Sequence, residues 1–278
     1  MLRLENVSKK FDNFELKNIS FHLEEGFIMG LIGPNGSGKT TLIKIIMNLL
    51  ECDEGTIYFK GEDIRKDPIA FKEKVGFVYD NLYFYEHLKV NDFKNTVSLF
   101  YSNFESKKFD DYLRKFNIDK NTRIKNLSKG QSIKLMLAKA LSHNAKLLIL
   151  DEPTSGLDPI FRKDLIHILQ EELESGDKSI IISTHITQDL SAAADYITLI
   201  NNGQLIFSEN KDVINEKYKI IKGSKEEIDS FKDEIINRKD TPYYSEALIL
   251  DKSIDNDNIQ DASLEDIIYY YGRELRNG

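Results

Sequence analysis

The residues best suited to chemistry in this sequence form one glycine-rich stretch, Gly33-Pro34-Asn35-Gly36-Ser37-Gly38-Lys39-Thr40. The spacing matches the phosphate-loop pattern G-x-x-x-x-G-K-[ST], in which backbone N–H groups cradle phosphates and the lysine reaches the β- and γ-phosphates. An apolar run, 27–32, precedes the stretch, and a helical pattern, 41–47, follows it. A phosphate would lie at a helix N-terminus, where unpaired N–H groups and the helix dipole favour an anion. The pattern predicts that the chain binds a nucleoside triphosphate.

A second candidate is a pair of adjacent carboxylates, Asp151 and Glu152, which follows the apolar run 147–150. Buried parallel strands read as continuous apolar runs, and α/β sheets bind ligands at the carboxyl ends of their strands. At that edge Asp151 could hold Mg²⁺, and Glu152 could polarise a water for attack on the γ-phosphate. Adjacent acids at a surface turn are normally solvated and inert, but the strand and the phosphate loop favour the catalytic interpretation.

A third candidate is the start of a helical pattern at Ser128, Gly130 and Gln131. Ser128 and Gln131 have the spacing of a capping box, so an ordinary helix start explains both. Gly130 is not explained in this way, because glycine weakens the first turn of a helix. A glycine there indicates that another group approaches the backbone closely, at a helix N-terminus suited to phosphate.

Two single residues complete the list of candidates. Phe11 lies in a predicted turn, 28 residues before Lys39, where it could stack on a base or simply belong to the core. His185 directly follows the apolar strand pattern 178–184, whereas the other histidines show no partner in the sequence and are predicted to be structural. The aromatic run 83–85 could contact a partner or be buried, and both interpretations stay open.

The elements that must position these residues alternate between strand and helix patterns. Short strands are expected within 1–25, at 53–61 and at 75–79, and a helical pattern covers 90–118. A hairpin at 197–207 is the natural end of this part of the chain. Residues 211–278 are richer in acidic than in basic residues, with strands expected at 218–221 and 247–250 and helices at 225–236 and 263–271.

Composition limits the class of protein. Hydrophobic residues make up 41% and charged residues 30% of the 278, which is an ordinary globular balance. No run approaches the roughly 20 apolar residues of a membrane span, and the N-terminus lacks the pattern of a signal peptide. The single cysteine, Cys52, is typical of a reducing cytosol. A net charge of −8 argues against nucleic acid as a partner.

Taken together, these motifs resemble the ATP-binding subunit of ABC transporters across residues 1 to about 210. The resemblance implies ATP and Mg²⁺ as cofactors, with catalytic roles for Glu152 and His185 and a D-loop role for Asp158. It implies metal contacts from Thr40, Asp80 and Asp151. Nucleotide-binding roles are implied for Phe11, Gly33, Asn35, Gly36, Ser37, Gly38, Lys39, Thr40, Thr41, Ser128, Gly130 and Gln131.

The family fold is the ABC-type P-loop NTPase, an α/β class with a mixed sheet core and a helical subdomain, here expected at about 85–142. The domain would span 1–210, with a small C-terminal α/β extension at 211–278. The family works as a head-to-tail dimer that sandwiches two ATP molecules, so the partner would be a second copy or a homologous ATPase chain. A separate multi-span membrane subunit would hold this chain at the cytoplasmic face of the membrane.

Two departures from the family pattern stand out. Lys129 replaces the first glycine of the signature motif, and Asp80 replaces the usual glutamine of the Q-loop, which puts its Mg²⁺ contact in doubt. With the aromatic run and the acidic extension, Asp80 makes the chain look most like bacterial exporter subunits, the nearest being those that handle antimicrobial or amphipathic peptides. The alternative is a non-transport ATPase such as a scaffold ATPase of iron–sulfur assembly. Only 87 residues separate Thr40 from Ser128, which leaves no room for an inserted coiled coil.

Overall fold

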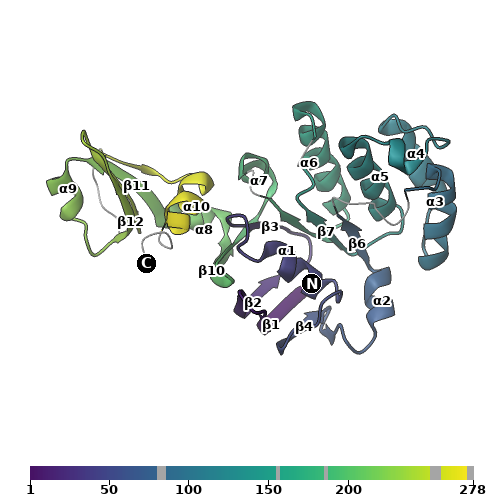
Figure 1. The fold of residues 1–278 in the computed structure, drawn as a ribbon, viewed down its shortest axis with the longest axis horizontal. Coiled ribbons are helices and arrows are strands. Elements are labelled where there is room, and N and C mark those ends of the chain that lie inside the picture. The colour runs from purple at the N-terminus through teal and green to yellow at the C-terminus, as the bar shows by residue number, and fades with distance from the viewer. Residues whose placement is uncertain (80–85, 155–156, 185–186, 251–257, 274–278) are drawn as a thin grey trace.

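The computed structural model describes residues 1–79, 86–154, 157–184, 187–250 and 258–273. Across these residues the strands form two sheets, which lie in different halves of the molecule (Figure 1). The larger sheet has the strand order β5-β4-β1-β2-β10-β9-β3-β8-β7-β6, and the smaller has the order β12-β13-β11-β14. No helix within the described residues is long and apolar enough to cross a membrane.

One half of the large sheet is antiparallel and comes mostly from the N-terminal residues. It contains β1 (Leu2–Lys10), β2 (Glu15–Leu23), β4 (Glu54–Phe59) and β5 (Glu62–Asp63). The prediction of several short strands within 1–25 was wrong in number, because two nine-residue strands fill this region. Phe11 lies in the turn between them, as the sequence predicted.

The other half of the large sheet is built around parallel strands. It contains β3 (Ile28–Ile32), β8 (Ser179–Ser183), β7 (Leu147–Asp151) and β6 (Val75–Val78), with β9 (Tyr196–Asn201) beside β3. Every residue of β3, β7 and β8 is buried, which explains their unbroken apolar runs. Because the strands are parallel, the residues that follow them meet at one edge of the sheet. The hairpin partner β10 (Gln204–Asn210) then joins β9 to β2.

Helices cover the sheet and build the helical subdomain, which includes α3, α4 and α5 (Figure 1). The helices up to this point are α1 (Lys39–Ile46), α2 (Pro68–Glu73), α3 (Val90–Val97), η2 (Ser98–Phe100), α4 (Ser106–Lys115), η3 (Ile124–Asn126) and α5 (Lys129–Leu141). The helical pattern over 90–118 is therefore interrupted before α4. Glu105 donates its N–H to the Ser142 carbonyl, and the Tyr101 ring stacks on His143, so tertiary contacts hold this segment out of a helix.

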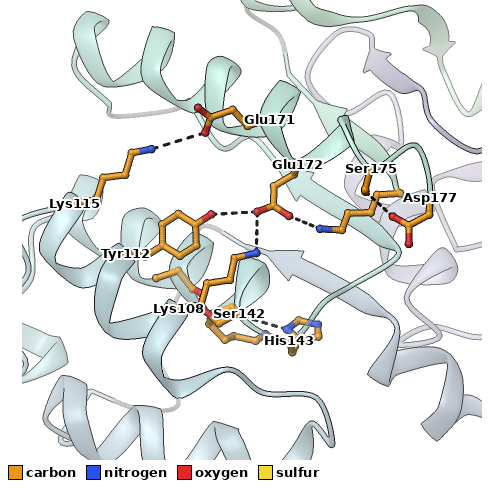
Figure 2. Close-up of polar contacts among 12 residues, drawn as sticks. Lys108, Tyr112, Lys115, Ser142, His143, Glu171, Glu172, Ser175 and Asp177 are labelled. Atoms are coloured by element: carbon orange, nitrogen blue, oxygen red, sulfur yellow. Dashed lines mark hydrogen bonds and ion pairs between the residues drawn. The ribbon is translucent and has the colours of Figure 1, made fainter.

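A buried ion cluster fastens this subdomain to the parallel strands (Figure 2). Glu172 lies near the end of α6 (Pro159–Leu173), and its carboxylate accepts hydrogen bonds from Lys108 at 3.0 Å and Tyr112 at 3.1 Å, both on α4. Lys178, directly before β8, donates to the other carboxylate oxygen. Burial alone would raise the pKa of Glu172, but the hydrogen bonds from Lys178 and Lys108 outweigh it and lower that pKa.

The second sheet belongs to the C-terminal residues. After α7 (Thr187–Ala193) and the β9–β10 hairpin, α8 (Lys211–Lys217) leads directly into β11 (Tyr218–Gly223). The remaining elements are α9 (Lys225–Asp229), β12 (Ile235–Asp240), β13 (Ser245–Leu250), β14 (Ile259–Asp261) and α10 (Leu264–Arg273). The helix predicted over 225–236 was wrong beyond Asp229, because the next strand pairs with β13 and this sheet contact overrides the helical pattern.

The hydrophobic core is continuous between the two sheets. Ile197 and Leu199 of β9 belong to the same buried cluster as Tyr218 of β11 and as Ile267 and Tyr270 of α10. The side of the extension that carries α10, yellow in Figure 1, faces the large sheet. The C-terminal residues are therefore packed onto the rest of the chain along an apolar seam.

Candidate nucleotide site

The phosphate loop, residues 33–40, is shaped by glycines that no other residue could replace in this backbone. Gly33 has φ 149°, and a Cβ there would lie 2.0 Å from the Ile200 carbonyl oxygen. Gly38 has φ 110°, and a Cβ there would meet Leu16 and Phe14 at 2.7 and 2.8 Å. The loop therefore lies tightly between β2 and the end of β9, with Asn35 and Gly36 exposed at its tip.

Lys39 is the buried cation of this loop, with 6% of its surface exposed. Its Nζ donates to the carbonyl oxygens of Gly33 at 2.8 Å and Pro34 at 3.1 Å. Burial lowers the pKa of Lys39, while the charges of Glu152 and Asp151 act in the opposite direction. Ser183 of β8 pairs with Leu31 of β3 and with Asp151 of β7, so the phosphate loop and the two carboxylates follow strands that end at one edge of the sheet.

The loop also offers unpaired donors to an anion. The Ser37 hydroxyl is buried and has no hydrogen-bond partner among the described residues. Gly38 caps α1 without a side-chain hydrogen bond, and the first turn contains no acidic residue that would compete with an anion. Thr40 and Thr41 lie half-buried in that turn. A buried orphan hydroxyl beside an uncapped helix N-terminus fits a bound phosphate group.

Asp151 and Glu152, at the end of β7, both hydrogen-bond to Ser183 of the neighbouring strand. Asp151, 5% exposed, accepts a 2.5 Å hydrogen bond from Ser183 Oγ on the neighbouring strand β8. Glu152 has φ 50°, in the left-handed region that glutamate rarely adopts, and its N–H donates to the Ser183 carbonyl at 3.0 Å. Backbone strain of this kind gathers at functional sites, where surrounding contacts hold it in place.

The donor set fits Mg²⁺ held partly by phosphate. Within the described ranges, no three His, Cys, Asp or Glu side chains gather as a metal cluster. Mg²⁺ is usually bound by one or two carboxylates together with waters and substrate phosphates, so an all-protein cage is not required. Asp151 supplies a fixed carboxylate, and Thr40 supplies a hydroxyl in the first turn of α1.

An aromatic pair lies beside the loop. Phe11 is 40% exposed, its N–H donates to the Phe14 carbonyl at 2.8 Å, and the two ring centroids are 6.2 Å apart. Phe14 in turn packs against Gly38. The sequence pointed to Phe11, but it did not single out Phe14, because alternation within a strand makes such a residue look like ordinary core.

The hairpin between β9 and β10 contacts the phosphate loop through its backbone. Its two-residue turn, Asn202-Gly203, has positive φ at both positions, as Asn-Gly turns favour. The Gly203 N–H donates to the Ser37 carbonyl at 2.9 Å, and the Ile200 carbonyl lies against Gly33. The sequence predicted this hairpin but gave no signal that it would contact residues more than 160 positions earlier.

The helix start at Ser128 is a capping box, as the sequence predicted. Ser128 Oγ accepts from the Gln131 N–H at 3.2 Å, and Gln131 Oε1 accepts from the Ser128 N–H at 3.0 Å. Ser128 is exposed and Gly130 is half-buried. The helix packs on β6, which is three strands away in the sheet order from β3, the strand that leads into the phosphate loop.

Asp158 is also a helix cap, for α6, and accepts from the Phe161 N–H at 2.9 Å. This hydrogen bond lowers the pKa of the Asp158 carboxyl group. Several residues singled out in the sequence lie outside the described residues. They are Asp80, the aromatic run 83–85, residues 155–156 of the D-loop and His185. β8 ends at Ser183, so the predicted strand before His185 is present.

Comparison with known proteins gives consistent matches. A family model described as "ABC transporter" matches residues 16–155. The chain is 30% identical over 219 residues to the ABC transporter ATP-binding protein YtrB of Bacillus subtilis (strain 168), covering 78% of this chain and 75% of that protein. It is 34% identical over 216 residues to the lantibiotic transport ATP-binding protein SrtF of Streptococcus pyogenes, covering 76% and 92%. Other relatives are named for import.

Solved structures agree with the sequence matches. An ATP-binding subunit of an ABC transporter superimposes with a TM-score of 0.72 at 26% identity, covering 77% of this chain and 92% of that chain. The predicted ABC-type P-loop NTPase fold is therefore confirmed, and the smaller antiparallel sheet is an addition to it. The chain belongs to the ABC transporter family, as an ATP-binding subunit that hydrolyses ATP.

Proposed function

We propose that this chain drives export of a substrate through a separate membrane subunit, using ATP bound at residues 33–40. The observation that carries the proposal is the strand register: Ser183 of β8 pairs with Leu31 of β3 on one side and with Asp151 of β7 on the other, so the phosphate loop and the two carboxylates follow strands that end at the same edge of the sheet. In the structure Lys39 Nζ donates hydrogen bonds to two carbonyl oxygens of its own loop. A bound γ-phosphate would replace these carbonyls as acceptor, and its charge would make the hydrogen bond stronger.

Each residue then has a distinct role in hydrolysis. Ser37 and the first N–H groups of α1 bind phosphate oxygens, and Lys39 neutralises the charge that develops on them. Thr40 and Asp151 would hold Mg²⁺, which would help to neutralise the negative charge of the phosphate groups. Glu152 orients the attacking water and accepts its proton, and His185 is assigned a catalytic role beside Glu152. Phe11 stacks on the adenine.

The signature residues complete the site from a second chain. Ser128 and Gly130 lie at an accessible helix N-terminus, and the helix packs on the far side of the parallel strands. A twofold head-to-tail pair would bring each signature helix to the other chain's phosphate loop, and closed twofold symmetry would complete both sites at once. Gln131 and Asp158 fix the two helix starts that would meet the partner.

The export direction rests on the sequence resemblance to exporter-type subunits, and the relatives include proteins named for import as well as for lantibiotic transport. The lantibiotic transport protein SrtF is similar over nearly its whole length, and its printed role supports a peptide-like substrate. We place the chain at the cytoplasmic face of the membrane, held there by the membrane subunit. Residues 1–210 form the ATPase domain, and 211–278 form an extension with its own sheet.

Two variants test the ATPase assignment. Glu152→Gln should keep ATP binding, abolish turnover and trap a closed dimer that elutes earlier in size exclusion. Lys39→Ala should lose both binding and turnover, and serves as the matched control. Turnover at the wild-type rate in Glu152→Gln would overturn the role of Glu152. The transport assignment is tested by affinity purification from the native membrane, where a multi-span protein should co-purify. Recovery of iron–sulfur assembly proteins instead would overturn it.

A further inference from the structure

Helix α10 hydrogen-bonds to two segments near the proposed nucleotide site, the start of α7 and the hairpin between β9 and β10. It starts with a capping box in which Ser263 and Asp266 exchange hydrogen bonds of 3.0 and 3.1 Å. Ile267 and Tyr270 on its inner face are fully buried. The helix packs on α7 and β9 of the ATPase domain and on β12 and β13 of the extension. Helix α10 therefore contacts both parts of the chain, as α8 does through β10 and β11.

The first tie is a side-chain hydrogen bond to α7. Thr187 Oγ1 donates to Glu265 Oε1 at 3.0 Å. Thr187 is 2% exposed and is the first residue of α7, only two positions after His185 in the sequence. Glu265 thus contacts the start of the helix that follows the proposed catalytic histidine.

The second tie leads to the phosphate loop. Asn201 Nδ2 donates to the Tyr271 carbonyl at 2.8 Å, and Asn201 itself is 6% exposed. Asn201 precedes the hairpin turn whose Gly203 N–H donates to the Ser37 carbonyl. The next residue of α10, Gly272, lies directly against the loop, since a Cβ there would be 3.5 Å from Pro34 Cγ.

The other end of the connection is anchored in the extension. The Tyr270 hydroxyl donates to Glu246 Oε1 at 2.8 Å, and Asn237 Nδ2 donates to the Tyr270 carbonyl at 2.9 Å. Both partners lie on the strands β13 and β12. A shift of α10 would therefore move the small sheet, the start of α7 and the hairpin beneath Ser37 together.

We propose that α10 of the extension is a positioning element of the ATPase site, with Glu265 setting the start of α7 and the Tyr271 carbonyl holding Asn201 beneath the phosphate loop. The proposal rests on the proposed roles of His185 and of residues 33–40. Each tie has its own kinetic consequence. Loss of the Thr187 bond lowers kcat, because α7 follows the catalytic histidine. Loss of the Asn201 bond raises KM for ATP, because the hairpin supports the phosphate loop.

The experiment is a double-mutant cycle on the full chain. Glu265→Ala and Thr187→Val should each lower kcat about three- to tenfold, which is the range that the net free energy of one typical hydrogen bond spans. The double variant should be no slower than either single one, because both remove the same bond. Thr187→Ser, which keeps the hydroxyl, should restore most of the wild-type kcat. Asn201→Ala should raise KM by a similar factor with little change in kcat.

A matched control separates positioning from simple destabilisation. Tyr270→Phe is a variant of the same helix, α10. It removes the hydrogen bond from the Tyr270 hydroxyl to Glu246 of β13, but it removes neither hydrogen bond between α10 and the ATPase domain. It should lower Tm slightly and leave kcat and KM at wild-type values. Additive losses in the cycle, or equal losses of kcat in Tyr270→Phe, would overturn the proposal.

Two outcomes distinguish this inference from the proposed function. If Lys39→Ala and Glu152→Gln are inactive while Glu265→Ala is fully active with unchanged KM, the positioning role fails and the ATPase site stands. If Lys39→Ala and Glu152→Gln retain turnover, the proposed site itself fails. In that case any effect of Glu265→Ala cannot act through it.

Discussion

Ser183 hydrogen-bonds to both Asp151 and Glu152, the two acidic residues at the end of the neighbouring strand. Its hydroxyl donates to Asp151 Oδ1 at 2.5 Å, and its carbonyl accepts the Glu152 N–H at 3.0 Å. One residue of β8 thus fixes the proposed metal ligand through its side chain and the strained backbone of the proposed base through its main chain. Groups that orient a metal ligand in this way tune affinity as strongly as some ligands do.

Ser183→Ala should raise the half-saturating Mg²⁺ concentration of the ATPase about tenfold or more, because Asp151 loses its hydrogen-bond partner. The measurement is turnover against Mg²⁺ at fixed ATP. Ser179→Ala is the control, since Ser179 is equally buried on the same strand but its hydroxyl donates to the Glu24 carbonyl. An unchanged Mg²⁺ dependence in Ser183→Ala would contradict the role of this hydrogen bond.

Complementation tests the shared site. Lys39→Ala chains and Ser128→Arg chains should each be inactive alone, whereas their mixture should regain roughly a quarter of wild-type turnover. Half of the dimers in an equal mixture are mixed, and each mixed dimer has one intact site. Turnover is measured after subunit exchange, with dimer content checked by size exclusion. Dimeric mixtures without recovered activity would rule out sites shared between chains.

Asp80 is expected to act in coupling more than in nucleotide binding. A carboxylate cannot donate a hydrogen bond, whereas glutamine both donates and accepts. Asp80→Gln should change ATP affinity by less than about tenfold, roughly 1.4 kcal/mol, while the ratio of partner-stimulated to basal turnover changes more. The measurements are nucleotide titration and ATPase activity with and without the membrane subunit in lipid. Lost ATP binding at an unchanged ratio would make Asp80 a ligand instead.

The buried cluster around Glu172 should dominate local stability. Glu172→Ala leaves the buried amine of Lys178 without its carboxylate, so unfolding free energy should fall by about 3 kcal/mol. Glu171→Ala should cost about 0.5 kcal/mol or less, because its contacts with Lys115 at 4.0 Å and His167 at 3.2 Å both lie at the exposed surface. Urea unfolding of both variants measures the difference. Equal losses would refute the special role of Glu172.

His143 should make the protein less stable in acid. The ring is buried between the carbonyls of Lys139 and Val75, and burial, with the Lys139 and Lys108 charges, lowers its pKa despite the two backbone hydrogen bonds. A lowered folded-state pKa means that the unfolded chain binds the proton more readily. The stabilisation is therefore complete above the ordinary histidine pKa and is lost as the pH falls through the folded-state value.

The check is Tm against pH for wild type and His143→Phe, between about pH 7.5 and about pH 5. The variant keeps an aromatic ring beside Tyr101 but removes the one N–H that a neutral imidazole can donate to a carbonyl, so its Tm should be lower near neutral pH. Its Tm should also depend less on pH than that of wild type. Parallel curves would show that another group causes the acid sensitivity.

The chemistry-bearing parts of the fold were predictable because they depend on local pattern. Residues 33–40 need glycines at fixed positions, and buried parallel strands need unbroken apolar runs, so both are visible in the sequence. The capping box at Ser128 is equally local. The helix predicted over 225–236 failed because pairing with β13, a contact distant in sequence, decides the conformation there.

The supporting contacts of the site were not predictable for the same reason. Ser183 and Phe14 both occur in ordinary strand patterns, and nothing local tells which atom of another strand they will meet. Asn201 and Glu265 come from segments with no motif, and their importance depends on how the second sheet docks. Long-range pairing thus decides which residues support the site, while local pattern decides which residues can do chemistry.

The apolar seam between β9 and α10 also has a consequence for biosynthesis. Ile197 and Leu199 leave the ribosome well before Ile267 and Tyr270, with which they share a buried cluster. At typical elongation rates that interval lasts on the order of 10 s. During it the nascent ATPase domain exposes an apolar face beside its phosphate loop, so it offers a binding site to chaperones until residue 270 has been added and has docked.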